Sequence, residues 1–365
     1  MSAAVEVAAF GSGSPPARAL RKRVASLLAA GELVALPTET VYGIFARADR
    51  PEALERLRNV KRRPEEKVFT WHVGDVRSLG AFPQLWHSAR RLAEKYWPGP
   101  LTLVLHGVPR GLELASSGGW TGVRLPAFAP TAKLLADLDF PVVGSSANRH
   151  GGAALVDAAS IASEFAGELA LVLDGGEPAL KEGSVVLKVG PGAFELLRPG
   201  IIDLAALRRT AGLRVGFVCT GNTCRSPMAE VLAGAALASK LSVPLTRIGE
   251  FGFELRSMGV FAHPGAPASR EAVEVMADAG LDLSMHRSTA LDTDVVGELE
   301  RVYALTQGHL EALRAAVAPS IAKRCTLLDP EGRDIPDPIG GTREDYERCA
   351  AAIRSALEVR VDEWV

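Results

Sequence analysis

The segment VCTGNTCRSPMAE (218–230) places two cysteines, a glycine and an arginine within seven positions. Gly221 and Asn222 are residue types that tolerate a positive φ, so they can turn successive backbone N–H groups inward as a nest for an anion. Such a nest favours the thiolate of Cys219 over the thiol, and Arg225 can bind two phosphate oxygens at once. The segment therefore has the chemistry of a cysteine nucleophile that attacks phosphorus.

The flanking elements would place this loop at a ligand site. LRVGFVC (213–219) is an apolar run suited to a buried strand, and open α/β sheets bind ligands at the carboxyl ends of their strands. Ser226 is predicted to cap the next helix and Pro227 to be its first residue, which would direct the positive end of the helix dipole at the anion. Ser226 can also donate a hydrogen bond to the sulfur of Cys219 when it leaves.

A candidate general acid lies far downstream, in DIPDPIGGTREDYERC (334–349). Asp337 precedes a proline that stiffens the backbone and two glycines that let the loop turn back over the anion site. A carboxyl group there would protonate the leaving group and then deprotonate the attacking water. Asp-Pro alone is more often an ordinary turn, and the cysteine segment is what favours the catalytic interpretation.

These motifs resemble the low-molecular-weight protein phosphatase family over residues 213–362. The resemblance implies that Cys219 is the nucleophile, Arg225 binds phosphate, and Asp337 is the general acid, with a phosphorylated protein as substrate and no cofactor. It also implies that Cys224 can pair reversibly with the nucleophile and protect it from oxidation. The other residues predicted to contact the phosphate are Thr220, Gly221, Asn222, Thr223, Cys224 and Ser226.

For this half of the chain, the sequence leaves one alternative to catalysis and one open choice of substrate. The cysteines could be core residues and Arg225 a helix-end charge, but an arginine at a helix N-terminus opposes the dipole unless an anion is bound. The phosphorylated residue also stays open. Family members that act on phosphotyrosine usually carry aromatic residues after the Asp-Pro, where this chain has Ile339. Members that act on phosphoarginine resemble it in having threonine at the position of Thr223.

The first half contains three polar segments beside apolar runs: LPTETVYG (36–43), KRRPEEK (61–67) and SSAN (145–148). Taken singly, turn chemistry and a helix C-terminal charge explain them. Together they resemble the YrdC-like threonylcarbamoyl-adenylate synthase family over residues 16–202. The further landmarks in order are His72 on an apolar run, WPGPLTLVL (97–105), GVRLP (122–126), DGG (174–176) and LRPG (197–200).

The second resemblance implies condensation of L-threonine, bicarbonate and ATP into threonylcarbamoyl-AMP, with release of pyrophosphate. The product would be used by a downstream tRNA-modifying transferase complex. Magnesium would accompany the ATP, held by phosphate and water, with no metal site of the protein's own. The residues implied to face the nucleotide are Lys61, Arg63, Lys67, Asn148 and Arg198. Those implied to face the threonine are Thr40, His72, Arg124, Ser146 and Ser184. Arg124 could pair with a carboxylate through two hydrogen bonds.

The first half departs from its family at several positions. Ile44, Phe45 and Ala46 follow the Tyr-Gly where Leu-Gly-Ala is usual, and Phe45 in place of glycine is expected to narrow the pocket. Val68–Phe69 and Val185 also differ from the usual residues. The alternative is that this half is a non-catalytic module that binds nucleotide or RNA.

Length and composition predict two tandem α/β domains of a cytoplasmic protein. The 365 residues exceed what one core usually serves, and 41 Lys+Arg against 43 Asp+Glu give no global basic field for nucleic acid. The four cysteines all fall in the last two-fifths of the chain and fit a reducing compartment, and no apolar run suits a signal peptide or membrane span. Strand candidates at 101–105, 141–146, 169–174, 184–189 and 213–219 alternate with helical patterns, which implies a mainly parallel sheet. The two resemblances imply an open twisted YrdC-like sheet with helices first, and then a Rossmann-like parallel sheet flanked by helices. Residues 205–213 are expected to be a polar connector.

Overall fold

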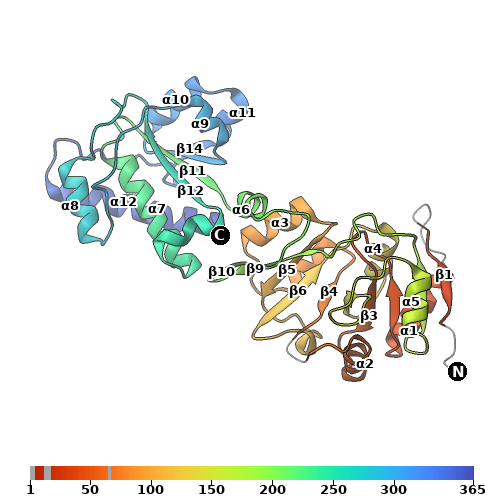
Figure 1. Cartoon of the computed structure of the whole chain (residues 1–365). Helices are drawn as coiled ribbons and strands as arrows, with labels where there is room; N and C mark the ends of the chain where they lie inside the picture. The colour runs from red at the N-terminus through yellow and green to blue at the C-terminus, as the bar shows by residue number, and fades with distance from the viewer. Residues whose placement is uncertain (1–4, 12–17, 65–66) are drawn as a thin grey trace. The chain divides into compact units, whose positions relative to one another are not determined.

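The computed structural model describes residues 5–11, 18–64 and 67–365. The chain divides into two compact units, residues 1–207 and 208–365 (Figure 1). Residue 16, the predicted start of the first domain, lies outside the described residues, as do residues 65 and 66 of the KRRPEEK segment. The two units are described in turn.

The first unit is built on a ten-stranded sheet with the strand order β1-β8-β2-β3-β7-β4-β6-β5-β9-β10. Its elements in chain order are β1 (Val7–Ala9), α1 (Arg18–Ala29), β2 (Val34–Leu36), β3 (Gly43–Arg47), α2 (Pro51–Lys61), β4 (Thr70–His72), η1 (Val76–Ala81), α3 (His87–Tyr96), β5 (Leu101–His106), η2 (Glu113–Ala115), β6 (Trp120–Arg124), α4 (Ala129–Ala136), β7 (Val142–Ser146), α5 (Ala158–Glu164), β8 (Leu171–Asp174), β9 (Val185–Gly190) and β10 (Ala193–Arg198).

This sheet is mixed, whereas the alternation of elements predicted a mainly parallel one. Strands β2 and β8 pair in parallel, but β3 runs antiparallel to both β2 and β7. Only six residues, 37–42, join β2 to β3. A parallel crossover needs a dozen or more residues, so this connection forces the antiparallel pairing.

Helices cover part of each face of the sheet. Successive strand residues point to opposite faces, so Ile44 packs in one apolar cluster with residues of α2 and α5, and Phe45 in another with residues of α1 and α4. The face that carries Phe45 continues across β7, β4, β6, β5, β9 and β10, where polar side chains replace apolar ones. That open stretch of the sheet is where a ligand can lie.

The second unit has a four-stranded sheet in the order β12-β11-β13-β14, and every pair in it is parallel, as predicted. The chain leaves central β11 for β12 on one side and later returns to β13 on the other, so the carboxyl end of β11 is a topological switch point. Its elements are β11 (Arg214–Cys219), α7 (Arg225–Leu241), η3 (Leu245–Phe251), β12 (Glu254–Gly259), α8 (Arg270–Asp278), α9 (Thr293–Glu298), β13 (Arg301–Ala304), α10 (Gln307–Ala316), α11 (Pro319–Ala322), β14 (Cys325–Leu327) and α12 (Arg343–Trp364).

Two local predictions differ from the structure. The expected polar connector is largely helix α6 (Leu204–Ala211), because Leu207 and Ala211 fall on one face and are both fully buried. Helix α7 begins at Arg225 with Cys224 at its N-cap, so Ser226 does not cap it and Pro227 is its third residue.

Among the described residues no single helix is long and apolar enough to cross a membrane. In that described part of the chain, one bent pair of helices, α7 and η3 at an angle of 75°, passes the test of length and composition together.

Candidate active sites

The cysteine loop, residues 219–225, is held open by Asn222. Cys219 ends β11 and is buried, and Asn222 has φ of 54°, as its residue type predicted. The Asn222 carboxamide accepts from the backbone N–H of Thr289 at 2.7 Å, and its backbone carbonyl lies 2.8 Å from Nε2 of His286. These bonds tie the loop to the segment before α9 and keep it in its turned conformation.

The floor of the cysteine loop is Gly259, the last residue of β12. A Cβ at this position would lie 2.5 Å from the carbonyl oxygen of Thr220 and 2.9 Å from the backbone nitrogen of Asn222. Real Cβ atoms do not approach backbone atoms so closely, so the loop can rest on this strand only because residue 259 has no side chain. The sequence did not single out this glycine.

Ser226 lies beneath the sulfur instead of capping the helix. Its Oγ is 3.0 Å from Sγ of Cys219 and accepts a hydrogen bond from Nδ2 of Asn222 at 2.8 Å. The one hydroxyl proton has two acceptors within reach, the sulfur and the carbonyl of Met258 at 3.3 Å. A thiolate at Cys219 is the stronger acceptor because it is charged.

Arg225 and Asp337 are brought together from positions 112 residues apart. Nη2 of Arg225 donates to Oδ2 of Asp337 at 2.6 Å, and it lies 3.5 Å from Oγ1 of Thr220. The arginine side chain is 6% exposed and the aspartate side chain 46% exposed. The predicted acid therefore lies at the mouth of the loop, directly over the predicted phosphate ligand.

Cys224 and Thr223 lie on the far side of the same loop. Sγ of Cys224 is 3.4 Å from the hydroxyl of Tyr346 on α12 and 3.6 Å from Oγ1 of Thr223. Burial, and then the hydrogen bond to Cys224, raise the pKa of Tyr346 to about 12, so this phenol stays protonated at neutral pH. Tyr346 was not among the predicted residues, and only its place in the helix after the Asp-Pro motif connects it to the site.

The first unit has a cavity of about 520 Å³ on the open face of its sheet. Its floor is formed by same-face residues of seven neighbouring strands, β3, β7, β4, β6, β5, β9 and β10. Seven of the ten predicted residues line it: Arg63, Lys67, His72, Arg124, Ser146, Ser184 and Arg198.

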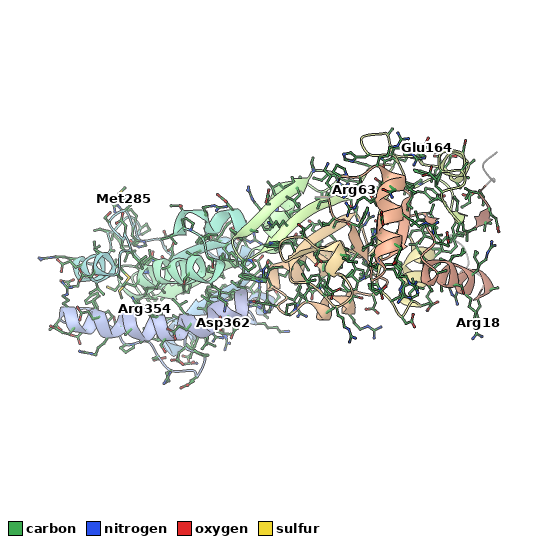
Figure 2. All side chains as sticks on the ribbon, turned by 90° about the horizontal axis from the view of Figure 1, so that it is seen from below. Arg18, Arg63, Glu164, Met285, Arg354 and Asp362 are labelled. Atoms are coloured by element: carbon green, nitrogen blue, oxygen red, sulfur yellow. The ribbon has the colours of Figure 1, made fainter. Side chains whose placement is uncertain are left out.

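Unbalanced positive charge gathers in this cavity. Arg63, which follows α2 and is labelled in Figure 2, has its pKa lowered by burial and by Arg58 and Arg198. Burial and then Arg124 likewise lower the pKa of Arg198. None of the described residues that line the cavity is a carboxylate. Guanidinium groups that repel one another in a concave site are a favourable place for a polyanion.

The other three predicted residues support this wall from behind. Nζ of Lys61 donates to the backbone carbonyls of Ser146 and Asn148 and, at 3.2 Å, to the Asn148 side chain. Burial, then Arg63 and Arg149, lower the pKa of Lys61 to about 7. We expect the ammonium form to persist here, because three acceptor oxygens surround a group that carries three donors only when protonated.

Thr40 accepts a hydrogen bond from Nη2 of Arg124 at 2.7 Å, and the same nitrogen donates to Oε1 of Glu39 at 2.7 Å. Arg124 was predicted to pair with a substrate carboxylate, and in the structure it pairs with a carboxylate of the chain. Glu39 belongs to the PTETVYG motif but was not predicted to have a role. The pair is buried on both sides, at 6% and 13% exposure.

His72 is a neutral acceptor in the cavity. Its Nδ1 lies 3.0 Å from the carbonyl of Thr70, which can only accept, so Nδ1 carries the proton and Nε2 is the free acceptor. Burial and Arg124 lower the pKa of His72 to about 3, against a weaker opposing effect of the bond to Thr70.

Phe45 is accommodated by two glycines. The Phe45 ring meets the His72 ring edge-on, with the ring centroids 4.9 Å apart. Phe45 also lines the cavity, which is the position from which it was predicted to narrow the pocket. A Cβ on Gly43 or Gly144 would lie 2.7 or 2.8 Å from this ring. The bulky side chain therefore occupies space that its strand neighbours leave free.

Two further contacts in this unit were not predicted. Oγ1 of Thr102, inside the WPGPLTLVL motif, lies 2.8 Å from Oγ of Ser184, which accepts from Arg198 at 2.9 Å. The hydroxyl of Tyr42 donates to the carbonyl of Gly176 at 2.8 Å, so the PTETVYG and DGG motifs meet in space. The motifs themselves were the available signal, since Thr102, Tyr42 and Gly176 each lie inside one.

Comparisons with known proteins match the two halves separately. A family model described as Telomere recombination, for the Sua5, YciO and YrdC proteins, matches residues 26–200. A model described as Low molecular weight phosphotyrosine protein phosphatase matches residues 214–363. The protein-arginine-phosphatase of Geobacillus stearothermophilus is 37% identical over 41% of this chain and 91% of its own length. The chain belongs to both families.

The Sua5/YciO/YrdC half also has named relatives. The threonylcarbamoyl-AMP synthase of Pyrococcus abyssi is 34% identical over 52% of this chain and 56% of its own length, so this chain spans little more than half of that relative. The solved structure of Sua5 from the same organism has a TM-score of 0.50 at 27% identity and covers 62% of this chain and 74% of that one. The predicted fusion of two enzyme families, and the α/β fold of each half, are therefore confirmed.

Proposed function

We propose that residues 213–362 form a phosphatase domain that hydrolyses phosphorylated proteins through a phosphocysteine. The observation that carries the proposal is the position of Cys219 Sγ, 3.0 Å above the Ser226 hydroxyl in a loop that also presents Arg225. The thiolate attacks phosphorus while Arg225 binds two of its oxygens, and Asp337 gives its proton to the leaving group. Water then attacks the phosphocysteine, Asp337 takes the water's proton, and the Ser226 hydroxyl stabilises the departing thiolate.

The Asp337 carboxylate accepts a hydrogen bond from the Arg225 guanidinium that would bind the phosphate. Substrate must therefore displace it from the guanidinium. The dianion that replaces it then favours the protonated acid, because like charges at close range disfavour ionisation.

The residue that is dephosphorylated is proposed to be phosphoarginine. Support comes from Thr223, whose small polar side chain leaves room at the loop for a guanidinium, and from the relative named protein-arginine-phosphatase. The test compares kcat/KM for phosphoarginine and phosphotyrosine peptides in wild type and Thr223→Ile. We expect the variant to lose phosphoarginine turnover selectively. Wild-type turnover of phosphotyrosine alone would overturn the assignment and leave a tyrosine phosphatase.

We further propose that residues 16–202 form a domain that synthesises threonylcarbamoyl-AMP from L-threonine, bicarbonate and ATP. The cavity with Arg63, Lys67 and Arg198 suits the triphosphate, and His72 and Ser184, which line the same cavity, are proposed to contact the amino acid. The threonine amine adds to bicarbonate with loss of water to give a carbamate, and a carbamate oxygen then attacks the α-phosphorus of ATP and displaces pyrophosphate. The nucleophile thus comes from the substrates, and the chain supplies orientation and positive charge.

A magnesium ion fits this site only as a companion of the nucleotide. No carboxylate is among the described lining residues, and none of the described residues form a group of three or more His, Cys, Asp or Glu side chains that could hold a metal. The ion would be coordinated by phosphate oxygens and water, and it would neutralise charge on the triphosphate.

The synthase proposal is tested by pyrophosphate release. We expect release that requires ATP, L-threonine and bicarbonate together, and Arg63→Ala should abolish it. A preparation that binds ATP but releases no pyrophosphate would favour the alternative of a nucleotide- or RNA-binding module. Transfer to tRNA would then need a separate enzyme complex, which is proposed as the downstream partner.

A further inference from the structure

His309 is a buried side chain that contacts the cysteine loop and has no role in the mechanism above. It lies in the first turn of α10 and is 6% exposed. Its Nε2 is 2.8 Å from Oγ1 of Thr220, the residue next to the nucleophile, and its Nδ1 is 2.9 Å from Oγ1 of Thr306. Thr220, by contrast, is exposed.

The hydrogen bonds around His309 form a continuous line to the predicted acid. Thr306 accepts from the backbone N–H of His309 at 3.3 Å and so caps α10. At the other end, Thr220 Oγ1 lies 3.5 Å from Nη2 of Arg225, which can only donate, and the same Nη2 donates to Asp337 at 2.6 Å. The imidazole thus links a rigid helix start to the guanidinium through one hydroxyl.

Without His309 the Thr220 hydroxyl would be free to rotate in water. An exposed threonine has staggered rotamers of similar energy, and only one places Oγ1 beside Nη2 of Arg225. Burial and Arg225 lower the pKa of His309 to about 4, while Asp337 and Asp334 act weakly in the other direction. The ring is therefore neutral at physiological pH and adds no second cation next to the phosphate ligand.

We propose that His309 is a positioning residue of the phosphatase: it fixes the Thr220 hydroxyl, which in turn holds the guanidinium of Arg225 in the orientation that receives the phosphoryl group. The inference rests on the proposed phosphatase activity. Its effect should appear in anion binding more than in the chemical step, because the nucleophile, Ser226 and the acid are untouched.

The two ring nitrogens allow a selective test. Gln places its amide near Nε2, so His309→Gln keeps the contact to Thr220. Asn places its amide near Nδ1, so His309→Asn keeps only the contact to Thr306. Vanadate affinity, together with kcat and KM for p-nitrophenyl phosphate, is measured for both variants and for His309→Ala. Gln307→Ala, an exposed neighbour in the same turn, is the control.

We expect the Asn and Ala variants to weaken vanadate binding and raise KM by about tenfold, the size of one hydrogen bond that acts on a charged group, with a smaller change in kcat. The Gln variant should stay within about threefold of wild type. Thr220→Val should reduce vanadate affinity as much as His309→Asn does. The double variant that carries both changes should bind vanadate no more weakly than either single variant. Urea unfolding of each variant checks that the fold persists.

Several outcomes would overturn the proposal. If His309→Asn kept the vanadate affinity of wild type and His309→Gln did not, His309 would only support the start of α10. If the losses of affinity in the Thr220 and His309 variants were fully additive, the two residues would not be linked. Failure of the proposed phosphatase activity can be distinguished from failure of the positioning role, because the wild-type protein would then not hydrolyse p-nitrophenyl phosphate. Vanadate affinity would still follow the Gln and Asn pattern if the positioning role is correct.

Discussion

Two arginines, Arg225 and Arg124, were predicted to bind phosphate and a substrate carboxylate, and each forms an ion pair with a carboxylate of the chain itself. Their partners differ in burial: Asp337 is nearly half exposed, whereas Glu39 is 13% exposed and also accepts from the backbone N–H of Ala127. The first pair can open to solvent when substrate arrives. The second is less exposed and has an additional backbone bond, so Arg124 also helps to form the wall of the cavity that it lines.

The contact of Phe45 with Gly144 predicts a coupled pair. Gly144→Ala would put a Cβ 2.8 Å from the Phe45 ring, and overpacking of this kind costs about 1 to 3 kcal/mol. We expect urea denaturation to show a lower free energy of unfolding for Gly144→Ala. In the double variant, Phe45→Leu should restore part of that free energy. Gly122→Ala on the same face is the matched control, since its Cβ would meet nothing closer than 3.6 Å. Equal losses at both glycines would contradict the pairing.

His72 predicts acid sensitivity of the first unit. Its pKa is 6.5 as a free group and about 3 in the fold, so the unfolded chain binds more protons between these values. The stability that comes from keeping the ring neutral is fully present above pH 6.5 and is lost as the pH falls toward 3. Urea midpoints from pH about 7.5 to about 4.5 should fall more steeply for wild type than for His72→Gln. Parallel slopes would show that His72 is not the group responsible.

Residue spacing shows the residues of the proposed reactive centre but not the residues that support them. Cys219, Arg225 and Ser226 lie within eight consecutive positions, so their relation is visible in the sequence. His309 contacts Thr220, which lies 89 positions earlier in the sequence. His309 belongs to an ordinary amphipathic helix pattern, and no motif in that segment indicates a functional role. Such contacts arise from how β11 and α10 pack, which depends on tertiary structure.

Among the elements, the cysteine loop depends on the strand beneath it. Gly259→Ala would drive a Cβ into the backbone of residues 220 and 222, which cannot move aside as a side chain can. We expect vanadate affinity to fall by at least about tenfold while the domain still folds. Gly249→Ala, where a Cβ would meet nothing within 4 Å, should leave affinity unchanged. Unchanged affinity in the Gly259 variant would show that the loop does not need this close approach.

Element type and order were largely predictable, and element pairing was not. The runs at 101–105, 141–146, 184–189 and 213–219 are strands as their apolar patterns indicated. The pattern of a strand does not say which strand it pairs with, and β3 lies between β2 and β7, which are more than a hundred residues apart. The connector became α6 because its apolar spacing, rather than its polar content, decided its structure.

For the whole molecule, the two sets of site residues fall within separate units. Cys219→Ser should abolish phosphatase activity and leave pyrophosphate release within about twofold of wild type, because no residue of the cavity lies in its unit. Arg63→Ala should have the converse effect. Both activities are measured on the full chain. A loss of both activities in either single variant would contradict functional independence.

The resting contact between Arg225 and Asp337 also sets which solutes can occupy the phosphatase. An incoming anion gains only what it offers beyond the single charge that the aspartate already places on the guanidinium through its Oδ2. Bicarbonate and free threonine also carry one negative charge on a carboxylate-like group, whereas a phosphoryl dianion brings a second charge. We therefore expect bicarbonate and threonine, two of the three substrates proposed for the first unit, to be poor inhibitors of the proposed phosphatase.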